Sequence, residues 1–388
     1  MRAWRIGRIA GIQINVDWTW LIIFFLITWS LAVGYFPFLL PGASTALYWG
    51  LGVFSSILLF LSVLAHELAH SLVARREGLP VESITLFIFG GVSQIEEEPR
   101  TPGNELYMAI VGPATSLVLG GIFFGLSLVS SPVQTPTAAV AQYLGIVNLA
   151  LGLFNLIPGF PLDGGRVLRA IVWGITHNLR RATRIASLVG QGFAFLLIFV
   201  GVALIFGGNL ISGIWLAFIG WFLNNAAVAS YRELIVRQSL QGVPVRRLMA
   251  TEVDHISPTI TIQQAIDEHI LSGRQHAYPV SNNSELLGLI CLHDIRNVPP
   301  ERRAEETVGE AMTPYERLVT ITPSEDLAKA VEKLGQGQYE QLPVIDSPRH
   351  LVGLLRRRDI IDYLQRQQSQ VENRVDQQET GRGPQPPG

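Results

Sequence analysis

The sequence predicts a multi-pass α-helical membrane protein, with about six transmembrane helices and a short membrane-associated β-hairpin, followed by a cytosolic α/β pair of similar units. Three observations support this fold class. Apolar residues make up 48% of the 388 residues. Charge is unevenly spread: residues 1–242 hold 13 Lys/Arg and 10 Asp/Glu, whereas residues 243–388 hold 16 and 21. The second part also repeats itself at a spacing of about 65 residues.

Composition narrows the function classes and the compartment. The formal net charge of −2 gives no reason to expect nucleic-acid binding. A single cysteine, Cys291, excludes an internal disulfide and suits a reducing cytosolic setting for the second part. Arginines are mixed with Gly and Asn over residues 1–18, and no small-residue cleavage site follows the first apolar run. We therefore expect no cleavable signal peptide.

The first part contains the apolar spans. Six segments have the length that a bilayer requires, at about residues 18–36, 47–73, 106–130, 138–157, 186–206 and 210–230. Every Lys and Arg of residues 1–242 lies outside these spans, and the segments 37–46, 131–137 and 207–209 contain none. Basic residues therefore occur in alternate loops, which lie on one side of the membrane. The positive-inside rule then predicts that both termini face the cytoplasm.

The second span ends in the motif His66-Glu67-Leu68-Ala69-His70. On a helix, His66 and His70 share a face, so both imidazoles can reach one metal ion. Glu67 beside them is placed to deprotonate a metal-bound water. The structural alternative is a pair of core histidines and a buried glutamate that neighbouring helices satisfy. Ionisable groups at membrane depth are costly, so three of them in this short stretch favour the metal centre.

Between the second and third spans, residues 81–95 are rich in β-branched and aromatic residues and are interrupted by Gly90-Gly91. This pattern predicts two short strands around a tight turn. One interpretation is a plain cytosolic hairpin. We favour the other, an edge strand that pairs with an unwound peptide, because irregular backbone at membrane depth must pack on protein or line a cavity. Gly90 and Gly91 are then candidates for substrate contact.

The fourth span ends in an irregular segment, residues 155–166, with two prolines and three glycines. Within it, Asp163 is the best third metal ligand by elimination. His177 lies in an arginine-rich loop, and Asp17 and Glu105 are expected to cap helices or lie at the interface. The structural alternative for Asp163 is a turn-forming Asp-Gly pair.

Two further features of the spans are less specific. Asn155 lies at the end of the fourth span, where it could hydrogen-bond a substrate or an oxyanion, or simply pack. The segment Gly112-Pro113-Ala-Thr-Ser116 predicts a kink in the third span and indicates nothing chemical.

Taken together, HELAH on a membrane helix, the FGG turn at 89–91, the GPATS kink and NLIPGFPLDGG at 155–165 resemble the site-2 protease family of intramembrane zinc metalloproteases. The resemblance covers about residues 1–230. It implies one Zn²⁺ held by His66, His70 and Asp163, with Glu67 as the catalytic base. It also implies regulated proteolysis of a single-span membrane protein, often an anti-sigma factor or a transcription factor, in the plasma membrane of a prokaryote-type cell.

The second part resembles a tandem cystathionine-β-synthase (CBS) module. Pro258 aligns with Pro323, and Asp294 with Asp359, and each unit is expected to fold as helix, strand, strand, helix. The resemblance implies adenine nucleotide binding (ATP, ADP or AMP) and a homodimer through these domains. Candidate nucleotide ligands are Asp294, Asp359 and Arg356. Cys291 and Arg356 replace the Ser or Thr that the family often has, so purely structural aspartates on a solvated basic edge are an equal alternative.

The expected domains are a transmembrane zinc metalloprotease domain at 1–240, CBS domains at 243–298 and 304–365, and a disordered tail at 366–388. A CBS-gated transporter or channel is the main competing function. The HExxH motif with a distant Asp-Gly favours hydrolysis, because a transport path would need polar residues on several spans. An inactive relative that only binds membrane partners is disfavoured because His66, Glu67, His70 and Asp163 are intact.

Overall fold

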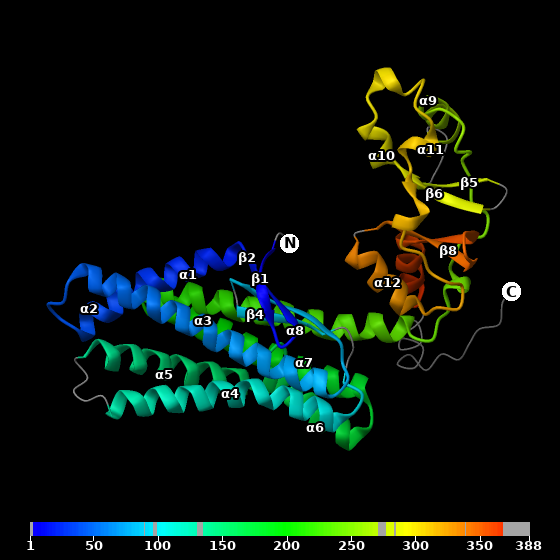
Figure 1. The fold of residues 1–388 in the computed structure, drawn as a ribbon. Coiled ribbons are helices and arrows are strands. Elements are labelled where there is room, and N and C mark those ends of the chain that lie inside the picture. Colours follow the sequence, from blue (N-terminus) through cyan, green and yellow to red (C-terminus); the bar gives the residue numbers. More distant parts are fainter. Residues whose placement is uncertain are drawn as a thin grey trace. The chain divides into compact units, whose positions relative to one another are not determined.

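The computed structural model describes residues 3–88, 90–95, 99–129, 135–270, 277–282, 285–337 and 339–367. The chain forms two compact units, Met1–Leu234 and Ile235–Gly388 (Figure 1). Each unit has buried hydrophobic clusters of its own. Of the expected tail, residues 366 and 367 belong to a helix that is described over 357–367, and the remainder lies outside the described residues.

Within the described residues, six helical segments are long and apolar enough to cross a membrane, as the sequence predicts. The first begins as α1 (Thr19–Ser30) and continues through the π-helical turn Leu31–Tyr35 into α2 (Phe36–Leu39). The others are α3 (Thr45–Arg76), α4 (Pro102–Val129), α5 (Pro136–Asn155), α7 (Leu179–Phe206) and α8 (Leu210–Leu240). Large apolar side chains on these helices, such as Phe199 at 71% exposure, face outward, which suits a lipid environment.

Local sequence explains where several of these helices begin. The Ser44 hydroxyl accepts a hydrogen bond from the backbone N–H of Leu47 and so caps α3. Thr135 caps α5 in the same way and is followed by a proline at the first helical position, where its missing N–H has no cost. The Asn178 side chain caps α7.

A four-stranded sheet in the order β1-β2-β3-β4 accompanies the helices. The predicted hairpin is present as β3 (Val81–Phe87) and β4 (Gly90–Ile95), and β4 lies at the edge. The strands β1 (Ala3–Ile9) and β2 (Ile12–Asp17) were not foreseen, and β2 pairs with β3 in parallel. Their signal is the alternation of buried apolar residues with polar ones along β2.

Between α5 and α7, where the sequence predicts a loop, the structure contains the helix α6 (Asp163–Thr176). It packs against α4 and α7. A side chain at Gly164 or Gly165 would overlap the backbone of residues 156–160, so these glycines allow the tight turn that leads into α6. The helix begins at Asp163, which positions this carboxylate at its N-terminus.

The second unit contains two similar halves. One holds α9 (Ile262–Ala265), β5 (Ala277–Asn282), β6 (Glu285–Cys291) and α10 (Leu292–Asn297). The other holds α12 (Leu327–Gln336), β8 (Gln341–Ser347), β9 (His350–Arg356) and the helix 357–367. The strands form one sheet in the order β5-β6-β9-β8, with β7 (Thr313–Pro314) paired to β6. The order of elements along the chain in each half agrees with the predicted helix, strand, strand, helix repeat.

Candidate metal centre

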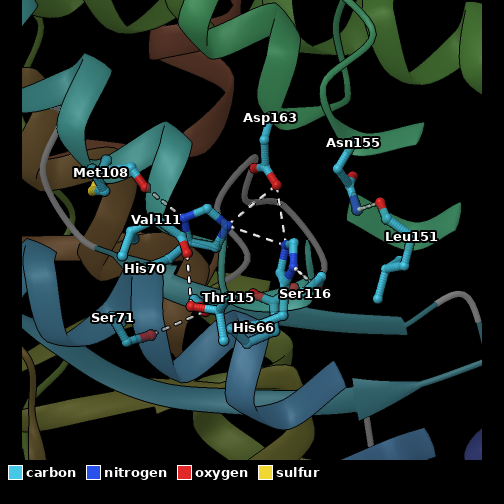
Figure 2. Close-up of polar contacts among 12 residues, drawn as sticks. His66, His70, Ser71, Met108, Val111, Thr115, Ser116, Leu151, Asn155 and Asp163 are labelled. Atoms are coloured by element: carbon cyan, nitrogen blue, oxygen red, sulfur yellow. Dashed lines mark hydrogen bonds and ion pairs between the residues drawn. The ribbon is translucent and has the colours of Figure 1, made fainter. Parts of the chain in front are cut away.

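Three predicted ligands meet at one point, although they come from two helices far apart in sequence (Figure 2). His66 and His70 project from α3, and Asp163 reaches them from the start of α6. The Oδ2 atom of Asp163 lies 3.1 Å from His66 Nε2 and 3.2 Å from His70 Nε2. The two Nε2 atoms lie 3.3 Å apart. Both histidines are buried.

Helix α4 orients both imidazoles. His70 Nδ1 donates a hydrogen bond to the carbonyl oxygen of Met108, at 2.6 Å. A carbonyl oxygen only accepts, so the proton of a neutral His70 ring is on Nδ1 and its Nε2 carries a lone pair. His66 Nδ1 lies 2.9 Å from the Ser116 hydroxyl, which is fully buried. In both rings Nδ1 contacts α4 and Nε2 is directed toward Asp163 (Figure 2).

This arrangement fits a zinc ion on two physical grounds. First, two imidazole nitrogens and a carboxylate oxygen face one another at a buried point, where one cation would be bound by all three. Second, ligands at about 2.0–2.1 Å in a tetrahedron are about 3.3 Å apart. The separations of 3.1, 3.2 and 3.3 Å agree with that value. Two nitrogens and one carboxylate oxygen are also a typical zinc donor set.

The segment 112–116 of α4, where the sequence predicts a kink, has a role at this site that the sequence did not reveal. A Cβ atom at Gly112 would lie 2.1 Å from His70 Nε2, so only glycine lets α4 approach the ring this closely. Ser116, from the same GPATS segment, contacts His66. Thr115, in contrast, bonds back to the carbonyl of Val111 within its own helix. The expectation that this segment indicates nothing chemical is corrected by these contacts.

The Glu67 carboxylate is held by the edge strand β4. Ser93 donates a hydrogen bond to Glu67 Oε2 at 2.9 Å. A Cβ atom at Gly91 would lie 2.4 Å from Glu67 Cγ, so the strand backbone packs directly on this side chain. Gly90 opens the strand with φ +130°, a conformation that favours glycine. Gly91 therefore lies at the candidate base.

Asn155 is the last residue of α5, and its side chain is turned back along that helix. Its Nδ2 donates a hydrogen bond to the carbonyl of Leu151, at 3.1 Å (Figure 2). This hydrogen bond is a contact within α5, so the suggested contact of Asn155 with substrate stays a prediction.

The carboxylates of Asp17 and Glu105, which are not expected to bind the metal, differ in role. Asp17 behaves as expected, because its Oδ1 accepts hydrogen bonds from the backbone and the hydroxyl of Thr19 at the start of α1. Glu105 makes contacts inside the protein. It is fully buried in the first turn of α4 and forms an ion pair with Arg169 of α6. Arg169 also lies over the ring of Phe160, 5.4 Å from its centroid.

In the second unit, Asp294 and Asp359 each accept a hydrogen bond from the residue just before the helix on which they lie. Asp294 Oδ2 accepts from the backbone N–H of Cys291, at 2.9 Å. Asp359 Oδ2 accepts from Arg356 Nε, at 2.8 Å. Asp359 also lines a pocket of about 390 Å³. The other lining residues of this pocket are Arg247, Leu248, Tyr363, Arg366 and Gln367. Asp294 and Arg356 are not among the residues that line it.

Comparison with known proteins gives matches in both parts of the chain. The profile of peptidase family M50 matches residues 54–142 and 131–199, and the CBS domain profile matches residues 245–301 and 308–366. The candidate zinc metalloprotease Rip3 of Mycobacterium tuberculosis is 38% identical over 358 residues, which cover 92% of this chain and 91% of that protein. The candidate zinc metalloprotease sll0528 of Synechocystis is 37% identical, covering 93% and 95%.

A solved structure is also similar. The site-2 protease from Methanocaldococcus jannaschii shares 30% sequence identity, with a TM-score of 0.41, and the match covers 59% of this chain and 95% of that one.

Proposed function

The chain belongs to peptidase family M50, the site-2 type of zinc metalloprotease, and on that premise we propose that it cleaves the transmembrane segment of single-span membrane proteins within the bilayer. The observation that carries this proposal is the convergence of His66, His70 and Asp163 next to Glu67. The two histidines lie on α3, a helix apolar enough to span the membrane.

We assign His66, His70 and Asp163 as the residues that hold the zinc ion. When bound, zinc supplies a Lewis acid that polarises the peptide carbonyl and acidifies water. Glu67 takes the proton from the attacking water on a carboxylate oxygen and passes it to the departing amine. Met108 and Ser116 keep both imidazoles in the orientation that presents Nε2.

The edge strand supports a mode of substrate binding. A helical substrate offers no free backbone groups, so it must unwind before its carbonyl can be attacked. An unwound segment can add to the open side of β4, where backbone hydrogen bonds provide affinity and Gly90 and Gly91 leave room for it. Because Gly91 packs on Glu67, this binding would bring the peptide close to the base. Asn155 is proposed as a further polar contact.

The test is cleavage of a tagged single-span substrate by purified protein, with Glu67→Gln as the variant. We expect loss of at least about 100-fold in rate, because general-base catalysis is removed, with bound zinc unchanged. Glu233→Gln on α8 is the matched control, since Glu233 is exposed and distant in sequence from the site, and it should cleave like the wild type. Equal cleavage by Glu67→Gln and wild type would refute the assignment of the base.

For the second unit we propose regulation by an adenine nucleotide. The supporting observation is the pocket beside Asp359, where Arg247 and Arg366 supply positive charge suited to phosphate. Calorimetry with ATP, ADP and AMP tests this, and Arg247→Ala should weaken binding about tenfold. Absence of heat with all three nucleotides would leave this unit as a scaffold or a dimerisation module.

The remaining proposals concern topology and partners. The alternation of arginine-bearing and arginine-free loops supports a plasma-membrane protein with both termini and the CBS pair in the cytoplasm. We propose anti-sigma or transcription factors as the substrate class, and a homodimer through the CBS domains. The proposed domain limits stay at 1–240, 243–298 and 304–365, with the tail at 366–388.

A further inference from the structure

A chain of hydroxyl groups leads from the interior of α3 to the candidate base. Ser71 Oγ donates a hydrogen bond to Ser93 Oγ at 3.2 Å, and Ser93 Oγ donates to Glu67 Oε2 at 2.9 Å. Ser71 is fully buried and lies four residues after Glu67, so both side chains are on one face of α3. Ser93 completes the chain from the edge strand β4.

We propose that Ser93, supported by Ser71, is a positioning residue that orients Glu67 and thereby makes the competence of the base depend on the edge strand. A glutamate side chain has three rotatable bonds, and leaving it free spreads the carboxylate over several rotamers. The Ser93 hydrogen bond selects one of them. The Ser71 hydroxyl donates a hydrogen bond to Ser93 Oγ. The Ser93 hydroxyl in turn donates its own hydrogen to the Glu67 carboxylate.

The position of β4 makes this dependence specific. Side chains alternate along a strand, so Gly91 and Ser93 face the same side. Both meet Glu67, one by backbone packing and the other by a hydrogen bond. The intervening residue, Val92, is 49% exposed. Among the described strands, β4 pairs with β3 alone, and no described strand pairs with its other side. A peptide that pairs there would hold β4, and so Ser93, in place.

The consequence is a link between substrate binding and catalysis. An edge strand with one neighbour is held less firmly than a central one, so the orientation of Glu67 is weakest when the open side is empty. Pairing with the unwound substrate would fix the strand and the base in one event. This part of the inference rests on the proposed proteolytic function, whereas the tether between Ser93 and Glu67 does not.

The tether is tested without any cleavage, by hydrogen exchange of residues 90–95 in metal-free full-length protein. Ser93→Ala and Glu67→Ala should each raise the exchange rate of this strand about tenfold, because each removes the same hydrogen bond to a carboxylate. The double variant should exchange no faster than either single variant. Ser93→Thr keeps a hydroxyl and should exchange like the wild type. Unchanged exchange in Ser93→Ala would overturn the inference.

The positioning role is tested by kinetics on the zinc-loaded protein. We expect Ser93→Ala to lower kcat about tenfold or more while KM and zinc content stay near wild type, with Ser93→Thr restoring most of the rate. Ser71→Ala should lower kcat a few-fold, and add nothing to Ser93→Ala. Thr85→Ala on the neighbouring strand is the control, because Thr85 pairs with Val92 and so faces the side of the sheet away from Glu67, and it should keep the wild-type rate.

The outcomes separate the two ideas. Wild-type kcat in Ser93→Ala, or a change in KM alone, would contradict the positioning role even if the protein is a protease. If the wild type does not cleave at all, the proposed function fails, and the exchange measurement still decides whether β4 is tethered to Glu67.

Discussion

At the scale of single residues, the site depends on which nitrogen of each histidine faces inward. An imidazole can bind a metal through either nitrogen, and the hydrogen bond at the other nitrogen decides. His70 is fixed by a carbonyl, which any residue at position 108 would offer. His66 is fixed by a side chain, Ser116, so this contact alone can be removed by substitution.

Ser116→Ala should therefore weaken zinc binding. We expect the zinc dissociation constant to rise about 10–100-fold, the usual effect of losing a hydrogen-bond partner of a metal-binding histidine. Competition with a chelator measures it. Thr115→Ala is the matched control, because the Thr115 hydroxyl donates to the Val111 carbonyl within α4, and its affinity should match the wild type. Equal affinities in Ser116→Ala and wild type would contradict the role of Ser116.

At the scale of elements, the site depends on how α6 is attached to α4. Asp163 is the first residue of α6, and Arg169 lies on the same helix less than two turns later. Arg169 pairs with the buried Glu105 of α4 and contacts Phe160, just before the turn into α6. Since α4 also orients both histidines, one helix places the imidazoles and anchors the helix that brings the carboxylate.

Arg169→Met should destabilise the membrane unit and loosen the third ligand. It removes the ion pair of a fully buried carboxylate, which should cost about 3–5 kcal/mol. Thermal unfolding in detergent and zinc content report the two effects. The double variant Glu105→Met/Arg169→Met removes both charges and should recover most of the stability. If Arg169→Met unfolded at the wild-type temperature, the ion pair would not hold α6.

At the scale of the whole molecule, the unfolding of each unit can be followed through a residue type that the other unit lacks. All eight tryptophans lie in the first unit, and the single cysteine, Cys291, lies in the second. Burial raises the pKa of the Cys291 thiol, with a further contribution from Asp294. The thiol should therefore react slowly while the second unit is folded. Tryptophan fluorescence and thiol labelling can follow the unfolding of the two units separately in one chain.

The second unit should lose stability in acid in part through Glu325. Burial alone raises the pKa of this carboxyl, but hydrogen bonds from Thr322 and Lys333 outweigh it and lower the pKa below its ordinary value. A lowered folded-state pKa means that the contribution is present at neutral pH and is lost as pH falls through that pKa. Glu325→Gln should cost about 1 kcal/mol at pH 7.

Urea unfolding measures this cost when it is followed by reaction of Cys291 with a pyridyl disulfide, a reagent that still reacts with thiols in acid. The difference between Glu325→Gln and the wild type should shrink as the pH falls below the ordinary range of a glutamate, because the wild-type carboxyl is then protonated as well. A difference that stays constant between pH 7 and pH 3 would show that ionisation of Glu325 is not its source.

The sequence alone determined the spans, the soluble repeat, the family and the list of ligand candidates. Each of these depends on short-range pattern: apolar length for the six spans, helical spacing for His66 and His70, and elimination among few carboxylates for Asp163. The sequence also indicated the β3–β4 hairpin through Gly90-Gly91. β1, β2 and α6 were missed, because short or mixed segments gain their stability mainly from tertiary packing.

Only the tertiary structure decided how the ligands are oriented and what holds the base. Met108 acts through a backbone carbonyl, so its residue type carries no signal. Gly112 and Ser93 matter because α4 and β4 pass close to α3, and the burial of Glu105 depends on a partner 64 residues away in α6. Such contacts join residues distant in the chain, and their distances are set by packing, which no local pattern records.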